Sequence, residues 1–485
     1  MALNLQHLRI SISLLVFFFA VFFSGVSAAY LPSESLPQGA RSTLVVQDLK
    51  TGKVLMQSGS NDDFFPPAST LKLITALAAK LELGNSFRFH TSLIKSGNDL
   101  VFNFSGDPTL TTNDLKAMVK QIAQGGIQTI KGDIWLNGTA FNGYERAIGW
   151  PWDILGVCYS APPSAINLDE NCVQASISTP SPSPYSDKTR VYVPEHLPIH
   201  VANKVVAVSK DEQEETHCAL ELLTSANNHY TLKGCVVKRR NPIPLKFAVQ
   251  QPELYVTRVI YSLLHKQGIR LEGQIKVGKP AIQRSDLIAS HQSKPLPELL
   301  EVMLKESDNL IADTLTKAIG AKYYKQPGSF NNGTAAIKNI IRDNTGIDLK
   351  RDRIVDGSGL SRNDRMTRAN MSAILRYIWQ NDKQLGLIDI MPVSGTSGTL
   401  QYRKSMRKAP IKGNIIAKSG SVYGTYNMAG FGLDKQGKPT TLFVQYVADY
   451  FVNKDKKARK TTPPITKFEK AFYQEVIKLS RAIQP

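Results

Sequence analysis

The chain has 485 residues, of which 42% are hydrophobic and 20% are charged. This is the composition of a globular protein, and the length allows two or three domains. The formal net charge is +19, and after the N-terminal region no apolar run is long enough to span a bilayer.

The first thirty residues have the features of a secretory signal peptide. A short n-region ends at Arg9, an apolar run follows at residues 10–23, and small residues at 26–28 fit a cleavage site. The alternative is a membrane anchor, but the run is short for a span. We therefore expect residues 1–28 to be removed after Ala28 and the mature chain to be exported.

Export limits the partners that the positive charge can attract. Basic runs lie at residues 403–408 and 454–460. Nucleic acid is a poor partner for an exported protein, so an anionic cell-wall polymer or a membrane surface is the better candidate. Each run can also be an ordinary solvated surface.

The elements begin with two short strands at residues 40–60, around a Lys-Thr-Gly-Lys turn, and a helix at residues 68–83. From about residue 90 to 285, short alternating strands predominate between Gly-Asp, Asn-Gly and Pro-Ser turns. This pattern of short strands and turns predicts an inserted, β-rich region that contains one or two subdomains.

All four cysteines lie in this inserted region. An even number of cysteines in an exported chain suggests disulfides, and four cysteines allow three pairings. The two local pairings close short loops, and we predict these: Cys158–Cys172 and Cys218–Cys235. There is no Cys-x-x-Cys and no nearby histidine cluster of ligand spacing, so we expect no metal and no cofactor.

From residue 295 onward the pattern becomes helical again. Two helical stretches interrupted at residues 307–309 are followed by a helix at 366–380. Residues 414–425, 426–434 and 439–450 then predict three successive strands of an antiparallel sheet. The last segment, from residue 465, is an amphipathic helix that either packs on this sheet, which we favour, or lies on a membrane surface. The fold class is therefore α+β, an antiparallel sheet flanked by helices.

Three short motifs occur in order on these elements. Ser69-Thr-Leu-Lys72 opens the first helix, Ser307-Asp-Asn309 stands at a helix junction, and Lys418-Ser-Gly420 lies on a strand. Ser-x-x-Lys alone is weak, because it recurs at residues 92–95 and 405–408. All three motifs in this order are typical of penicillin-binding proteins and class A β-lactamases.

The chemistry supports this grouping. Residues three apart lie on one face of a helix, so Lys72 can reach Ser69 and act as its base. None of the eight histidines falls in the three motifs. Lys72 must be desolvated or placed near another cation, such as Lys418, to lose its proton. The N–H groups of Ser69 and Ser421 could form an oxyanion hole, and Gly420 would let a substrate lie against the strand.

The chain resembles the peptidase S13 family of D-alanyl-D-alanine carboxypeptidases and endopeptidases over nearly all of its mature length. Beyond the three motifs, the resemblance rests on GDPTL at 106–110, GWPWD at 149–153, DGSGLSR at 356–362 and YNMAGF at 426–431. It implies a penicillin-recognising serine transpeptidase-like domain at 29–88 and 289–485, interrupted by a large insertion. The insertion would comprise one domain at 89–165 and 244–288 and a second at 166–243.

The resemblance also implies roles for individual residues. Ser69 would be acylated, with Lys72 as its base. Ser307 would relay a proton to the leaving amine, and Asn309 would hold the substrate amide. Lys418 would supply the electric field around the site. Ser419 would bind the terminal carboxylate of the substrate, and Arg362 would lie near it.

Two positions depart from the family pattern. Lys418-Ser419-Gly420 stands where Lys-Thr-Gly is usual, and serine keeps the hydroxyl that the site needs. Near Trp-Pro-Trp, the family places an acidic side chain that contacts the free amine of the stem peptide. Ile154 occupies the matching place here and Asp153 stands one position earlier, so either Asp153 substitutes or that contact is missing.

We therefore expect a D-Ala-D-Ala carboxypeptidase and DD-endopeptidase in the periplasm of a Gram-negative-type bacterium. Its partners would be peptidoglycan stem peptides and β-lactams as covalent inhibitors, with no nucleic acid, and the resemblance allows a homodimer and peripheral membrane association. One alternative is a β-lactamase, although 238 residues separate Ser69 from Ser307, more than a compact lactamase needs. The other is a non-catalytic wall-binding protein that has kept the fold.

Overall fold

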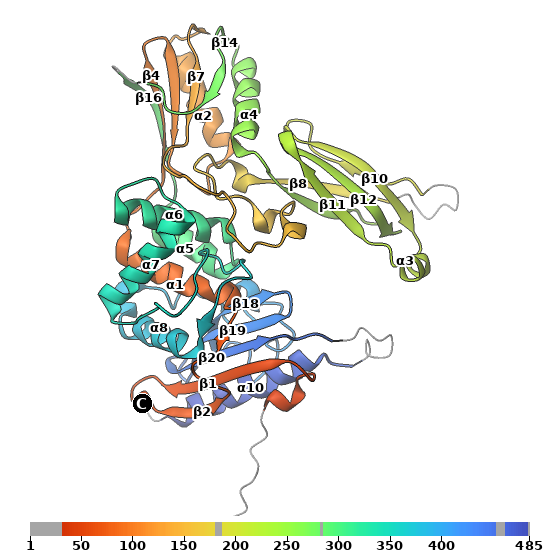
Figure 1. Ribbon diagram of the computed structural model, residues 1–485, viewed down its shortest axis with the longest axis vertical. Helices are drawn as coiled ribbons and strands as arrows, with labels where there is room; N and C mark the ends of the chain where they lie inside the picture. Colours follow the sequence, from red (N-terminus) through yellow and green to blue (C-terminus); the bar gives the residue numbers. More distant parts are fainter. Residues whose placement is uncertain (1–31, 180–186, 282–284, 453–460, 484–485) are drawn as a thin grey trace, which may run out of the picture.

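The computed structural model describes residues 32–179, 187–281, 285–452 and 461–483. The predicted signal peptide and the basic run at 454–460 lie outside these residues. The molecule is elongated (Figure 1). The two terminal parts of the sequence form one body, and the middle of the sequence forms two further lobes at its other end.

The terminal parts share a five-stranded antiparallel sheet in the order β18-β19-β20-β1-β2. The strands are β1 (Arg41–Asp48), β2 (Val54–Ser58), β18 (Ile415–Val422), β19 (Thr425–Leu433) and β20 (Pro439–Ala448). The two N-terminal strands therefore complete a sheet whose other three strands come from the C-terminal part. The predicted strands in both regions are confirmed.

Helices cover both faces of this sheet. On one face lie α1 (Lys72–Glu82), α5 (Leu296–Lys305), α6 (Asn309–Tyr324), α7 (Phe330–Thr345) and α8 (Arg368–Gln380), and on the other lies α10 (Pro464–Ala482). Side chains of a strand alternate between faces, so Phe431 and Val444 join the first core whereas Met428 and Phe443 join the second.

The apolar stripe of α10 packs on the sheet, as we favoured. Phe468, Phe472 and Val476 are fully buried, and the Phe472 ring lies 5.9 Å from that of Phe443. The stripe is therefore not available to a membrane surface. Among the described residues, no helix has both the length and the apolar character needed to cross a bilayer.

Short elements complete this domain. They are η1 (Pro32–Ser35), the paired strands β3 (Phe64–Phe65) and β17 (Met366–Thr367), α9 (Asp382–Leu385) and η7 (Gly398–Leu400). The basic run at 403–408 is not a uniformly solvated surface. The Arg403 guanidinium pairs with the buried carboxylate of Glu469, to which Ser405 Oγ also donates at 2.6 Å.

The first lobe of the insertion contains a second five-stranded sheet, in the order β15-β7-β5-β4-β16. Its strands are β4 (His90–Ser96), β5 (Asp99–Phe104), β7 (Ile134–Asn137), β15 (Ile275–Val277) and β16 (Asp286–Gln292), beside the short pair β6 (Thr129–Ile130) and β14 (Arg270–Leu271). Two helices belong to this lobe, α2 (Thr112–Gln124) and α4 (Pro252–Lys266). The expectation of a predominantly β region missed both helices, because the turn-rich strands around them dominate the pattern.

The second lobe consists of two three-stranded sheets. One has the order β13-β8-β9, with β8 (Cys172–Ser178), β9 (Arg190–Tyr192) and β13 (Ile243–Ala248); the other has the order β10-β12-β11, with β10 (His200–Val208), β11 (Leu220–Ser225) and β12 (His229–Val237). The short helix α3 (Lys210–Thr216) follows β10.

Two expected domain boundaries fall inside strands. The boundary at 243/244 separates nearly all of β13 from β8, with which it pairs, and the boundary at 288/289 cuts β16, which pairs with β4. Both partner strands lie far away in the sequence, and a local pattern cannot show such a pairing. Keeping each strand with its partner would move these two boundaries a few residues later, to the ends of β13 and β16.

The insertion leaves and re-enters the body formed by the terminal parts at adjacent points. Leu296 N donates to Phe87 O at 2.9 Å, and Ser293 N donates to Phe89 O at 3.0 Å. Inside the insertion both predicted disulfides are present, Cys158–Cys172 and Cys218–Cys235. Cys158–Cys172 joins the turn η4 (Cys158–Ser160) to the first residue of β8.

Candidate active site

The candidate nucleophile lies on a short turn before the first helix. The sequence predicts one helix over 68–83, but the structure has a 3-10 turn, η2 (Ala68–Leu71), followed by α1 from Lys72. Ala68 has φ 47°, in the left-handed region. The side-chain amide of Asn427, on β19, donates to Pro66 O at 2.7 Å and Pro67 O at 3.0 Å. These contacts fix the entry to the turn that carries Ser69.

Lys72 is fully buried and directed at Ser69. Its Nζ donates to Ser69 Oγ at 3.0 Å, to Asn309 Oδ1 at 2.6 Å and to the Ser358 carbonyl at 2.8 Å. Burial lowers the pKa of Lys72 to about 8, against the opposing effect of nearby carboxylates, of which Asp313 is the largest contributor. At pH 7 roughly one Lys72 in ten is therefore a neutral amine, the form that a general base requires, and this fraction rises steeply toward pH 8.

A second serine–lysine pair lies across the site. Lys418 Nζ donates to Ser307 Oγ at 2.8 Å. Burial lowers the pKa of Lys418 well below its usual value, and the charge of Lys72 lowers it further. The positive charges of Lys72 and Lys418 repel each other, so one of these two lysines readily loses its proton.

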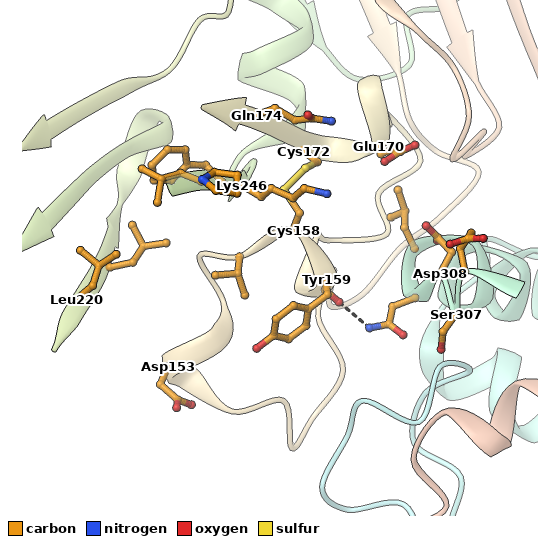
Figure 2. A pocket seen from close by; sticks show the side chains of 18 of the residues that line it. Asp153, Cys158, Tyr159, Glu170, Cys172, Gln174, Leu220, Lys246, Ser307 and Asp308 are labelled. Atoms are coloured by element: carbon orange, nitrogen blue, oxygen red, sulfur yellow. Dashed lines mark hydrogen bonds between the residues drawn. A yellow bond between two sulfur atoms is a disulfide. The ribbon is translucent and has the colours of Figure 1, made fainter. Parts of the chain in front are cut away.

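The Ser-Asp-Asn motif is held by the start of α6. Ser307 has φ 62°, and the Asp308 carboxylate accepts from Ile311 N at 2.7 Å and caps the helix. Asn309 has partners on both sides, because Oδ1 accepts from Lys72 and Nδ2 donates to the Tyr159 carbonyl at 2.7 Å (Figure 2). An amide oxygen has two lone pairs, so Oδ1 keeps the capacity to accept one further hydrogen bond.

Strand β18 lies directly against the nucleophile turn. A Cβ at Gly420 would lie 2.8 Å from Pro67 O, 2.9 Å from Thr70 N and 3.0 Å from Ser69 N. Only glycine permits this approach without moving backbone, which brings the strand within reach of Ser69. Beside it, the hydroxyls of Ser419 and Thr399 are 2.9 Å apart.

A cavity of 520 Å³ opens at Ser69. Ser421, Arg362, Asp153 and Ile154 all line it. The Arg362 guanidinium stacks over the Tyr423 ring, 5.7 Å from its centre. The structure thus brings Arg362 and Asp153, the two further residues that the sequence suggests as substrate contacts, to the cavity at Ser69.

Buried carboxylates support the site from behind, and sequence reasoning assigned them no role. Asp356 accepts from Trp150 Nε1 at 2.9 Å and from the N–H groups of Gly359 and Ser361, both at 2.7 Å. The GWPWD and DGSGLSR stretches are therefore in direct contact.

The Asp313 carboxylate accepts from Gly357 N at 2.8 Å and Ser358 N at 2.9 Å, which orients the Ser358 carbonyl that binds Lys72. Burial and the neighbouring Asp356 raise the pKa of Asp313 well above its usual value. Asp313 follows Ser-Asp-Asn by one helical turn, and this spacing is the signal that could have identified it.

No cluster of three or more His, Cys, Asp or Glu side chains suited to a metal ion occurs in the described ranges. The site as built can abstract a proton from a serine, stabilise an oxyanion at backbone N–H groups and return a proton through a second serine. That combination is the chemistry of acyl transfer from an amide.

Residues 28–471 match the D-Ala-D-Ala carboxypeptidase 3 (S13) family. D-alanyl-D-alanine carboxypeptidase DacB of Haemophilus influenzae is 34% identical over 454 residues, which are 92% of this chain and 93% of the relative. The crystal structure of penicillin binding protein 4 (dacB) from H. influenzae matches with a TM-score of 0.84, covering 93% of this chain and 98% of that one at 34% identity. The D-alanyl-D-alanine carboxypeptidase of Actinomadura strain R39 is 27% identical over 425 residues, 83% of this chain and 77% of the relative.

Proposed function

The chain belongs to the D-Ala-D-Ala carboxypeptidase 3 (S13) family of peptidases, and we propose that it is a serine-type D-Ala-D-Ala carboxypeptidase and DD-endopeptidase. Its substrates are peptidoglycan stem peptides and the D-Ala cross-links between them, in the periplasm of a Gram-negative-type bacterium. The single observation that carries the proposal is the buried Lys72 amine, hydrogen-bonded to Ser69 in a cavity beside Ser307 and Lys418.

Acylation begins when neutral Lys72 takes the hydroxyl proton of Ser69. Ser69 Oγ attacks the carbonyl of the penultimate D-Ala, and the N–H groups of Ser69 and Ser421 stabilise the oxyanion. As the C–N bond breaks, Ser307 gives its hydroxyl proton to the departing amine and receives in exchange the proton that Lys72 took from Ser69. Lys418, whose Nζ lies 2.8 Å from the Ser307 hydroxyl, favours that transfer. Water then hydrolyses the ester and releases the shortened peptide.

Substrate contacts follow from the lining of the cavity. We assign the terminal carboxylate to Ser419, whose hydroxyl is oriented by Thr399 at 2.9 Å. Arg362 lines the same cavity and is assigned with Ser419 to the terminal carboxylate, and Asp153 is assigned to the free amine of the stem peptide. The Asn309 side chain holds the substrate amide through the free lone pair of Oδ1.

The same chemistry makes β-lactams covalent inhibitors. Penicillin would acylate Ser69 and remain as a slowly hydrolysed ester. A relative from H. influenzae with a TM-score of 0.80 and 33% identity has been solved as a complex with a β-lactam. A β-lactamase would instead release the product quickly, so rapid nitrocefin turnover would overturn the proposal.

The resemblance also allows a homodimer, and analytical ultracentrifugation of the purified protein would test this.

The test compares the wild-type protein with Ser69→Ala. Purified sacculi are digested and analysed by mass spectrometry, which reports loss of D-Ala and loss of cross-links separately. We expect the variant to lose both activities and penicillin acylation, while it keeps binding to sacculi. Release of D-Ala from a pentapeptide by Ser69→Ala would refute the assigned nucleophile, and wild-type protein that binds sacculi without cleaving them would favour a non-catalytic wall-binding protein.

A further inference from the structure

A second and larger cavity adjoins the first. Its volume is 640 Å³, and it lies between the catalytic body and the second lobe of the insertion (Figure 2). Asp153, Tyr159, Ser307 and Asn309 line both cavities. Ser307, which delivers a proton to the departing amine in the proposed reaction, is one of the shared residues, so the new cavity begins beside that amine.

Part of the wall of this cavity is a turn at residues 169–171 that is held in place by hydrogen bonds and a disulfide. Asp169, Glu170 and Asn171 have φ of 50°, 58° and 47°, three consecutive left-handed residues that are not glycine. Each such residue costs roughly 1 kcal/mol, so the surrounding structure must enforce the turn. The Asp169 carboxylate accepts from Thr112 N at 2.8 Å.

Two further bonds complete the bracing. Asn171 is fully buried and its amide donates to the Pro162 carbonyl at 2.9 Å. The adjoining Cys172 is bonded to Cys158, next to Tyr159. This strained and braced turn presents the exposed Glu170 side chain to the cavity.

Charges follow an order along the cavity. In Figure 2, Asp308 lies next to Ser307, and Glu170 and Lys246 lie farther along the cavity. Within the described ranges neither Glu170 nor Lys246 forms a salt bridge or a side-chain hydrogen bond, although their charges influence one another. A carboxylate thus lies next to Ser307, and the exposed Lys246 ammonium lies farther along the cavity, near Glu170.

These charges suit the released half of a cross-linked peptide. The Ser69 O–C bond forms as the amide C–N bond breaks. The nitrogen keeps the electron pair, takes the proton relayed from the Ser69 hydroxyl and takes a second proton from solvent. The product is an ammonium at the cleavage point. The carboxylate on the same residue is the one assigned to Ser419, and the remaining carboxylates of the second stem lie farther away. The substrate amide carries no charge there, so Asp308 favours the product.

Size and apolar lining select a peptide over a single amino acid. Cavities of several hundred Å³ hold drug-sized ligands, and one alanine would fill little of this space. The side chains of Leu220, Leu222 and Leu232, from the second lobe, line the far side. They offer an apolar surface to the aliphatic part of a diamino acid and its neighbours.

We propose that this cavity is a leaving-side subsite that binds the second stem of a cross-linked pair, with Lys246 pairing with a carboxylate of that stem. The inference rests on the proposed function and deepens it. It assigns to the insertion the recognition of cross-linked over uncross-linked substrate, whereas the cavity at Ser69 serves both.

The experiment measures kcat/KM of the full-length mature protein on two substrates, a linear pentapeptide and a purified cross-linked dimer of stems. The variants are Lys246→Glu and Leu220→Glu. Their controls are Lys204→Glu and Leu223→Glu, at exposed positions of the same lobe that do not line the cavity. Leu223 is 42% exposed and Leu220 36%, so a glutamate is equally tolerable at both.

We expect Lys246→Glu to lower kcat/KM for the dimer by about tenfold to a hundredfold, the size of one charge-assisted contact. Leu220→Glu should do the same, while the pentapeptide rate and both controls stay at wild-type values. A dimer whose leaving stem has amidated carboxyl groups should be a poorer substrate for the wild type, with no further loss in Lys246→Glu.

Other outcomes separate the two proposals. Equal losses on both substrates, or no loss on the dimer, would overturn the subsite while leaving the peptidase activity intact. Wild-type protein that cleaves neither substrate would instead refute the proposed function, and the subsite with it.

Discussion

Trp150 Nε1 donates to Asp356 Oδ2 at 2.9 Å, and this buried hydrogen bond joins the insertion to the catalytic body. The same carboxylate receives the N–H groups of Gly359 and Ser361. The loop that it orders carries Ser358, whose carbonyl binds Lys72, and Arg362, which lines the cavity. One indole therefore helps to position groups on two sides of the nucleophile.

Trp150→Phe should destabilise the protein by about 2 kcal/mol, because the substitution removes a buried hydrogen bond to a carboxylate. Thermal or urea unfolding measures this. Trp152→Phe is the matched control, since Trp152 is 80% exposed and its substitution should change the free energy of unfolding by less than about 0.5 kcal/mol. Equal stability of the two variants would show that the Trp150–Asp356 bond contributes nothing net.

The rate of acylation should rise with pH, with a midpoint at about pH 8, and should level off above that pH. The reason is that the neutral form of Lys72 is the base. A fluorescent penicillin measures the second-order rate without substrate turnover. Lys80→Met, on the same helix, should keep this midpoint. A midpoint near 6, or a rate that still rises up to the ordinary lysine pKa, would contradict the assignment of Lys72.

The same pKa has a consequence for stability. Lys72 holds its proton less tightly in the folded chain, with a pKa of about 8, than in the unfolded chain, where the value is 10.5. Between these values the unfolded state binds more protons, so the contribution of this group to stability rises with pH across that window. The shifted pKa of Lys72 thus lowers the free energy of unfolding at neutral pH.

Gly420→Ala should reduce acylation about a hundredfold, because the new Cβ meets only backbone atoms of the nucleophile turn and β18 must move away. The free energy of unfolding should fall by about 1–3 kcal/mol. The control is Gly125→Ala at the end of α2, where the nearest atom is 3.4 Å away. If Gly420→Ala is acylated at the wild-type rate, the close approach is not needed for the site geometry.

Sequence patterns predicted the elements that have their own period or motif. The catalytic strands, the helix junction at Ser307 and the burial of the α10 stripe follow from such local signals. Local patterns could not show the pairing of β13 with β8 or of β16 with β4, because each pairing is decided by a distant strand.

At the site, the three motifs pointed to Ser69, Lys72, Ser307, Asn309 and Lys418, and the structure brings these residues together. The support behind them was not predictable in the same way. Asp313 and Asp356 act through backbone N–H groups, and Tyr159 and Ser358 act through their carbonyls. Main-chain contacts leave little trace in side-chain patterns.

The insertion enters and leaves at neighbouring points, Phe87 and Leu296, so a short linker could in principle replace it. Loop closure alone would not oppose such a deletion. A chain shortened in this way would nevertheless lose the partners of three groups: Trp150 for Asp356, the Tyr144 and Pro163 carbonyls for the buried Lys317 ammonium, and the Tyr159 carbonyl for Asn309. The chain could be closed without the insertion, but three buried groups would then lose their hydrogen-bond partners. A shortened enzyme would need new partners for Asp356, Lys317 and Asn309.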